Sequence, residues 1–87
     1  MYKKKVVLKV KEGFHARPAA LIVNKVREYD SCRVWLIKGN KVARGESLIE
    51  VLSLELKDGD HLTVKVEGEE EAKVAKDFGL FLESENF

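Results

Sequence analysis

The chain has 87 residues, enough for one compact domain spanning residues 1–87 with a small core. Hydrophobic residues make up 45% of it and charged residues 36%, which excludes collagen-like and low-complexity classes. Sixteen Lys and Arg face fifteen Asp and Glu, for a net charge of +1. This balance predicts neither a nucleic-acid partner nor attraction to a membrane surface.

The apolar runs and the cysteine content further restrict the class of protein. The longest unbroken apolar run, Ala19 to Val23, has five residues, too few for a transmembrane helix or a signal peptide. We therefore expect a cytoplasmic protein without membrane insertion. Cys32 is the only cysteine, which excludes an internal disulfide and a multi-cysteine zinc site. No metal and no cofactor are expected.

The first half of the chain alternates between strand and helix patterns. Val6, Leu8 and Val10 alternate with polar neighbours and predict a strand over residues 5–11. A helix is predicted from Ala16 to about Tyr29, because apolar residues recur there at intervals of three and four. Residues 32–37 form the next strand, and the turn at residues 38–41 leads into a short strand at residues 42–43.

The second half predicts a short helix, a central strand and a final helix. Ser47 and Glu50 have the spacing of a capping box, which starts a helix that runs to about residue 54 or 55. Residues 62–67 alternate as a strand, and Glu69, Glu70 and Glu71 lie in the first turn of the last helix. The buried residues of that helix are expected to be Val74, Ala75, Phe78, Phe81 and Leu82, and Gly79 is expected to weaken it.

The resulting order is βαββαβα. It predicts an α+β fold of two layers, in which three helices cover one face of a four-stranded sheet and the other face meets water.

The segment with the most chemical information is residues 13–19, Gly-Phe-His-Ala-Arg-Pro-Ala. It places His15 and Arg17 at a helix start, and none of residues 13–17 is Ser, Thr, Asp or Asn. Backbone N–H groups there, including those of Ala16 and Arg17, would lack side-chain acceptors. A phosphate oxygen would accept from them while meeting the positive helix end and the guanidinium of Arg17.

The same position affects the chemistry of His15. Nearby positive charge disfavours an imidazolium, so the ring stays neutral and able to attack phosphorus. The same positive charge then stabilises the attached phosphoryl group. The residues alone also allow a surface histidine whose neighbouring N–H groups bond to water. Both interpretations remain open at this level.

Residues 13–19, the βαββαβα order, Ser47 and the run at residues 51–54 together resemble the HPr family. HPr is the histidine-containing phosphocarrier of the bacterial phosphoenolpyruvate-dependent sugar phosphotransferase system. The resemblance covers essentially the whole chain and implies an open-faced sandwich with antiparallel strand order 1-4-2-3. It also implies that enzyme I phosphorylates His15 on Nδ1, that Arg17 stabilises the phosphoryl group and that sugar-specific IIA domains receive it. Such a protein is a phosphoryl carrier and not an enzyme.

Ser47 matches the serine that an HPr kinase/phosphorylase modifies in many Gram-positive relatives, where the product recruits a catabolite-control transcription factor. Glu46 replaces a common lysine, Glu50 replaces a usual glycine, and the preceding loop is one residue longer. An acidic neighbour opposes the addition of a phosphate, and capping alone gives Ser47 a structural role. Regulation and capping therefore both remain open for Ser47.

The second helix is expected to expose an apolar surface beside His15, where the family docks enzyme I and IIA domains. Its residues are Leu48, Ile49 and Leu52, of which Leu52 is the one expected to complete the core instead. Arg27 and Arg44 are candidate charges at its rim. We expect a monomer.

Two rival functions share parts of this pattern. A regulatory HPr-like protein would use His15 without serving a sugar permease. A binding module would use another surface, and Trp35, expected on the open side of the sheet, would then be a stacking platform for a base, although one aromatic residue without a basic groove is weak support. His61 is expected to be a surface histidine, and Lys3, Lys4 and Lys5 a solubilising strand edge.

Overall fold

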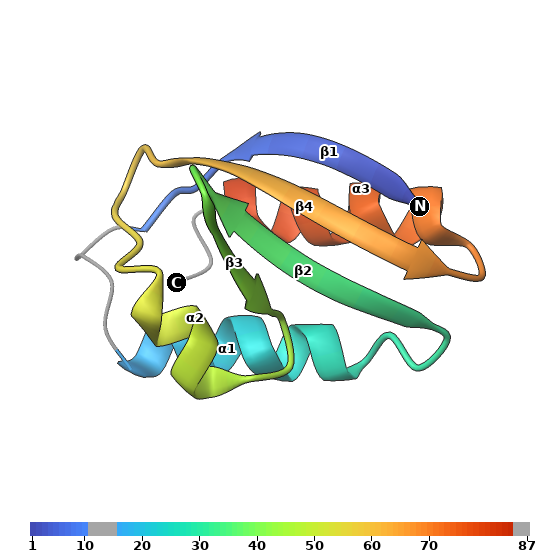
Figure 1. Ribbon diagram of the computed structural model, residues 1–87, viewed down its shortest axis with the longest axis horizontal. Helices are drawn as coiled ribbons and strands as arrows, with labels where there is room; N and C mark the ends of the chain where they lie inside the picture. Colours follow the sequence, from blue (N-terminus) through green and yellow to red (C-terminus); the bar gives the residue numbers. More distant parts are fainter. Residues whose placement is uncertain (11–15, 85–87) are drawn as a thin grey trace.

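The computed structural model describes residues 1–10 and 16–84, which form four strands and three helices. Figure 1 shows their arrangement. In chain order they are β1 (Tyr2–Val7), α1 (Ala16–Arg27), β2 (Cys32–Lys38), β3 (Lys41–Arg44), α2 (Leu48–Ser53), β4 (His61–Gly68) and α3 (Glu71–Glu83). The predicted βαββαβα order is confirmed.

The sheet is antiparallel throughout, with strand order β1-β4-β2-β3. The long strand β4 pairs with β1 on one side and with β2 on the other, and β3 pairs with β2 through a tight hairpin. This is the order that the family resemblance implied. The first and third strands of the chain therefore form the two edges.

One continuous core lies between the sheet and the helices. In Figure 1, α3 lies behind β1 and β4, which it contacts. Alternate side chains of all four strands point into this core, together with the apolar stripes of the helices. The buried members include Val6, Val34, Leu36, Ala43, Leu62, Val64 and Val66 from the strands and Ile22, Val23, Val51, Ala75, Phe78 and Leu82 from the helices. The apolar residues that recur at strand spacing and those that recur at helix spacing thus pack together in one layer.

Strand β1 differs in its limits from the predicted 5–11. It begins at Tyr2, because the length of β4 provides partners as far as Val66, and it ends at Val7. The alternating pattern continues beyond it without regular pairing: Leu8 N donates to Asp60 O at 2.9 Å, and Gly59 N donates to Leu8 O at 2.8 Å. Leu8 and Val10 are both buried, so the predicted inward face is correct although the strand is shorter.

Helix limits also differ slightly from prediction. Helix α1 ends at Arg27, two residues before Tyr29, and α3 begins at Glu71 after Glu70 in a left-handed conformation with φ 56°. Only Glu71 therefore lies in the first turn, where its carboxylate accepts from Gly68 N at 3.2 Å. Phe81 is half-buried and stacks on Phe78, with ring centroids 6.3 Å apart.

Two glycines permit close packing at particular points. A Cβ on Gly68, where φ is +140°, would lie 2.3 Å from Ser31 O. A Cβ on Gly79 would lie 3.1 Å from a methyl carbon of Val6. Gly79 was expected to weaken α3, but its absent side chain also lets the helix approach β1.

Candidate functional site

The start of α1 carries the described part of the predicted phosphate site. Ala16 is the first residue of the helix and Arg17 the second, and both are exposed. Pro18 occupies the first turn, where its missing N–H removes no helical hydrogen bond. His15 lies outside the described residues, as do Gly13 and Phe14, so the placement of its ring stays a prediction. The α1 dipole over 12 residues supplies a partial positive charge at this end.

Helix α2 packs against α1 and presents an exposed apolar surface. In Figure 1 it lies over the N-terminal half of α1, which it contacts. We call Leu48, Ile49 and Leu52 the α2 patch; their exposed fractions are 38%, 80% and 36%. The expectation that Leu52 completes the core is wrong, because Val51 and Leu54 occupy the inward positions of this short helix. All three patch residues are therefore available to a partner.

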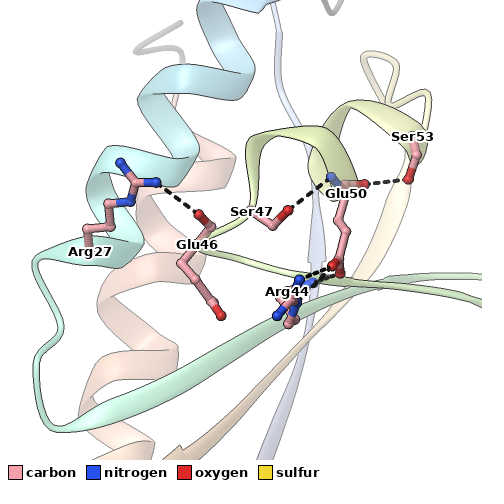
Figure 2. Close-up of polar contacts among 6 residues, drawn as sticks. All are labelled: Arg27, Arg44, Glu46, Ser47, Glu50 and Ser53. Atoms are coloured by element: carbon pink, nitrogen blue, oxygen red, sulfur yellow. Dashed lines mark hydrogen bonds and ion pairs between the residues drawn. The ribbon is translucent and has the colours of Figure 1, made fainter.

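Ser47 is the N-cap of α2, as predicted. Its backbone is extended, with φ −103° and ψ 110°, and its Oγ accepts a hydrogen bond from Glu50 N at 3.3 Å (Figure 2). This bond satisfies one of the free donors in the first helical turn. One half of the predicted capping box is thus present.

The prediction of the other half, a bond from Ser47 N to the Glu50 carboxylate, is wrong. The Glu50 carboxylate does not return to Ser47 N, which donates instead to Arg44 O at 3.1 Å. The Glu50 carboxylate accepts instead from Arg44 N at 2.9 Å and from the Arg44 guanidinium at 2.7 Å (Nε) and 2.6 Å (Nη2), as Figure 2 shows. Two guanidinium nitrogens on Oε2, together with the backbone N–H of Arg44 on Oε1, offer Glu50 more than one backbone N–H does.

This pair changes the titration of both groups. Hydrogen bonds from the Arg44 side chain, followed by the bond from its backbone N–H, hold the pKa of Glu50 below its ordinary value of 4.5. Hydrogen bonding to Glu50 likewise raises the pKa of Arg44. Arg44 was predicted as a rim charge, whereas its partner Glu50 was assigned to the cap. A six-residue separation across a strand, a loop and a helix start has no sequence signature.

Arg27 also has a structural contact. Its Nη2 donates to the backbone oxygen of Glu46 at 3.2 Å, which ties the end of α1 to the loop before Ser47 (Figure 2). The loop is therefore held from two sides, by Arg27 and by the pair of Arg44 with Glu50. These contacts fix the orientation of α2 and hence of its patch.

The remaining candidates lie elsewhere. His61 is exposed at the first position of β4, as expected of a surface histidine. Cys32 is half-buried and its thiol donates to Glu69 O at 2.7 Å. Within residues 1–10 and 16–84, no three His, Cys, Asp or Glu side chains are grouped to hold a metal ion. None of the helices described is long and apolar enough to cross a membrane.

Comparison with known proteins identifies the family. The family model described as "PTS HPr component phosphorylation site" matches residues 2–84. The chain belongs to the PTS-HPr family. It is 36% identical to the phosphocarrier protein HPr of Borreliella burgdorferi, over 97% of this chain and 96% of that protein. It is 31% identical to the HPr-like protein Crh of Bacillus subtilis, over 98% and 99% of the two chains.

A solved HPr structure has the same fold. The crystal structure of HPr-C-His from Thermoanaerobacter tengcongensis superposes with a TM-score of 0.85 at 32% identity, covering 97% of this chain and 93% of that one. The HPr resemblance and the open-faced sandwich are thereby confirmed. The family of HPr phosphocarrier proteins to which the chain belongs also includes the HPr-like proteins named Crh.

Proposed function

We propose that the protein carries phosphoryl groups in the cytoplasm, accepting them on His15 from phosphorylated enzyme I and passing them to IIA domains of sugar permeases. The observation that carries the proposal is an exposed Arg17 in the first turn of α1, two residues after His15, in a chain whose HPr-family match spans residues 2–84. The protein acts as a carrier and turns over no small substrate of its own.

The chemical step is an in-line displacement between two imidazoles. The lone pair of His15 Nδ1 forms a bond to phosphorus while the bond from phosphorus to the donor nitrogen breaks, and its electron pair returns to the donor ring. Arg17, the N–H groups of Ala16 and Arg17 and the helix dipole stabilise the charge of the transferred group. Transfer to a IIA domain repeats this step with His15 as donor. The partner's surface completes the environment, so a shallow docking contact suffices.

The α2 patch supplies that docking contact in our proposal. Leu48, Ile49 and Leu52 are exposed on a helix that packs on α1, and Arg27 and Arg44 lie near the ends of the loop leading to it. Exposed apolar groups with a polar rim are typical of transient protein interfaces.

Incubation with enzyme I and phosphoenolpyruvate, followed by intact mass measurement, tests the carrier function. We expect one acid-labile phosphate on the protein, none on His15→Ala, and a much slower gain on Arg17→Ala. A His15→Ala variant that gains the same phosphate would overturn the proposal.

The docking role of the α2 patch has a matched control. Ile49→Ser is expected to slow transfer from enzyme I about tenfold without changing the melting temperature, because it removes an exposed apolar contact of about 1–2 kcal/mol. Leu80→Ser removes a leucine of α3 that is 67% exposed, against 80% for Ile49, and leaves transfer unchanged. Equal slowing by both substitutions would contradict the assignment of docking to α2.

A second candidate function is regulation through Ser47, favoured by the similarity to Crh over 98% of the chain. In this role an HPr kinase/phosphorylase modifies Ser47, the product binds a catabolite-control transcription factor, and no sugar permease is served. The cap bond to Glu50 and the acidic neighbour Glu46 oppose modification. Acid-stable phosphate that depends on the kinase and is absent from Ser47→Ala would support regulation. Its absence would leave Ser47 as a cap alone.

A further inference from the structure

The face of the sheet that points away from the core has a distinct composition. Pairing register and burial alternation place twelve side chains on this open face: Lys3, Lys5, Val7, Arg33, Trp35, Ile37, Val42, Arg44, His61, Thr63, Lys65 and Glu67. Each of them is exposed or half-buried, whereas most of their inward neighbours form the core.

This open face concentrates positive charge that the whole chain does not show. Five of its side chains are cationic and one, Glu67, is acidic, which makes a formal charge of +4. Since the chain has a net charge of +1, everything outside the face carries a net charge of −3. Folding therefore separates charge that the near-neutral composition conceals.

Most of this positive charge is not neutralised by neighbours. Arg44 is paired with Glu50 at 2.6 Å. In the part of the chain that the structure describes, no carboxylate lies within ion-pair distance of Lys3, Lys5, Arg33 or Lys65. Four cations are thus left to attract a polyanion.

Protection of a strand edge does not account for all of these cations. Lysines on an edge strand such as β1 deter pairing with other chains, and this explains Lys3 and Lys5. Lys65 lies on β4, where it pairs with Lys3 of β1 on one side and with Trp35 of β2 on the other. Arg33 pairs with Glu67 of β4 alone, because β3 pairs with β2 only from Trp35 onward. The position of Lys65 in the middle of the sheet indicates a role for the surface itself.

An aromatic ring lies among these cations. Trp35 pairs across the sheet with Lys65 on one side and with Arg44 on the other, and Lys3 is the next residue in the same row. Lys65 Nζ lies 5.0 Å from the centre of the indole ring. Beside the ring, a hollow of about 250 Å³ is lined by Arg33, Trp35, Arg44 and Glu46. A ring that can stack on a base and cations that can contact phosphates therefore lie in one row across neighbouring strands.

We propose that the open face binds a single-stranded polynucleotide, with Lys3, Lys65 and Arg33 contacting phosphates and Trp35 stacking against a base. Charge complementarity selects a polyanion, and the indole selects one whose units carry flat rings. A sheet presenting an aromatic ring among basic residues is an established way to bind single strands. The proposal goes beyond the carrier function and uses none of its residues.

Titration with oligodeoxythymidylate of about twelve nucleotides, in about 50 mM salt, tests the proposal. Trp35 is the only tryptophan, so its fluorescence reports on this face alone. We expect saturable binding with quenched fluorescence. The double variant Lys3→Gln/Lys65→Gln should bind about tenfold more weakly, with a salt dependence shallower by about 1.4 in log K against log salt. Trp35→Leu has no tryptophan, so its affinity is measured by the anisotropy of a dye-labelled oligonucleotide, and it should lose about fivefold or more.

Matched controls separate this site from simple charge attraction. Lys73→Gln/Lys76→Gln makes the same change in net charge on α3, in the opposite layer, and should leave affinity unchanged. The proposal is overturned by absent binding, by an equal loss in this control, or by equal affinity for duplex DNA. Displacement of the oligonucleotide by polyglutamate with the same fluorescence change would also overturn it and assign the face to acidic protein segments.

Discussion

Among single residues, Arg44 and Glu50 have the greatest influence on the surroundings of Ser47. Their ion pair joins the end of β3 to the first turn of α2, and Arg44 O also accepts from Ser47 N. Two guanidinium nitrogens on one carboxylate oxygen, with the backbone N–H on the other, restrain both side chains more than a single contact does. The loop of residues 45–47 is therefore held at both ends, and Ser47 is kept in the extended conformation that an N-cap requires.

We predict that Arg44→Gln raises the pKa of Glu50 toward its ordinary value of 4.5, because the substitution removes the guanidinium hydrogen bonds that lower it most and keeps only the bond from the backbone N–H. Since the folded-state pKa is below the unfolded one, the pair's stabilisation is complete above about pH 4.5 and is lost as pH falls through the lowered pKa. Carboxyl NMR titration of both proteins measures this. Lys41→Gln, a cation of the same strand, should leave the titration of Glu50 unchanged. Identical Glu50 curves in wild type and Arg44→Gln would contradict the assignment.

At this scale the sequence predicted the roles of single residues better than their hydrogen-bond partners. The N-cap role of Ser47 was predictable because it depends on neighbours three residues away. The partner of Glu50 was not predictable, because Arg44 comes close to Glu50 only when β3 and α2 have taken their places in the folded chain. His15, the main predicted site residue, lies outside the described part, so its placement remains a prediction.

Among the elements, α2 depends most on its ends. It has six residues, of which Val51 is buried, so packing of its own face contributes little. Helices this short are unstable without capping and tertiary contacts. The bond from Glu50 N to Ser47 Oγ and the contact with α1 therefore maintain the α2 patch in a docking conformation.

We predict that Ser47→Ala lowers the free energy of unfolding by about 1 kcal/mol, the usual effect of losing a side-chain cap. Ser47→Asp should restore most of this loss, because a carboxylate accepts the same bond from Glu50 N. Urea unfolding followed by circular dichroism measures both. Ser53→Ala, at the other end of α2, should change stability by about 0.5 kcal/mol or less, since its exposed hydroxyl is replaced by water at Glu50 O. An effect of Ser47→Ala no larger than that of Ser53→Ala would refute the capping role.

Element types and inward faces followed from periodicity, whereas element ends did not. The inward residues Val6, Leu8 and Val10 were correct although β1 stops at Val7, because the same alternation continues in a segment bonded to residues 58–60. Leu52 was assigned to the core because apolar character alone suggested burial. In so short a helix, Val51 and Leu54 already fill the inward positions.

On the scale of the whole molecule, the sheet and helices share one apolar layer. Phe78 of α3, Ile22 of α1 and Val64 of β4 belong to the same cluster, which leaves no part with a core of its own among the described residues. The strand order could be expected from the family resemblance but not from the pattern alone, because alternation does not specify which strands pair. The charge separation on the open face was likewise hidden by a net charge of +1.

We predict that the protein unfolds in a single transition, because loss of any one layer exposes the whole core. Trp35 fluorescence reports on the sheet and far-ultraviolet circular dichroism reports mainly on the helices, so the two should give coincident urea curves. A fluorescence midpoint clearly separated from the circular dichroism midpoint would show that the layers unfold independently.

The strand order also has a consequence for synthesis on the ribosome. Edge strand β1 pairs with β4 and with no other strand of the described chain, and β4 ends at Gly68. During synthesis the segment of β1 therefore stays unpaired until β4 has left the exit tunnel of the ribosome. The lysines at positions 3, 4 and 5 keep this segment hydrated until then, so the sheet is completed only after β4 has emerged.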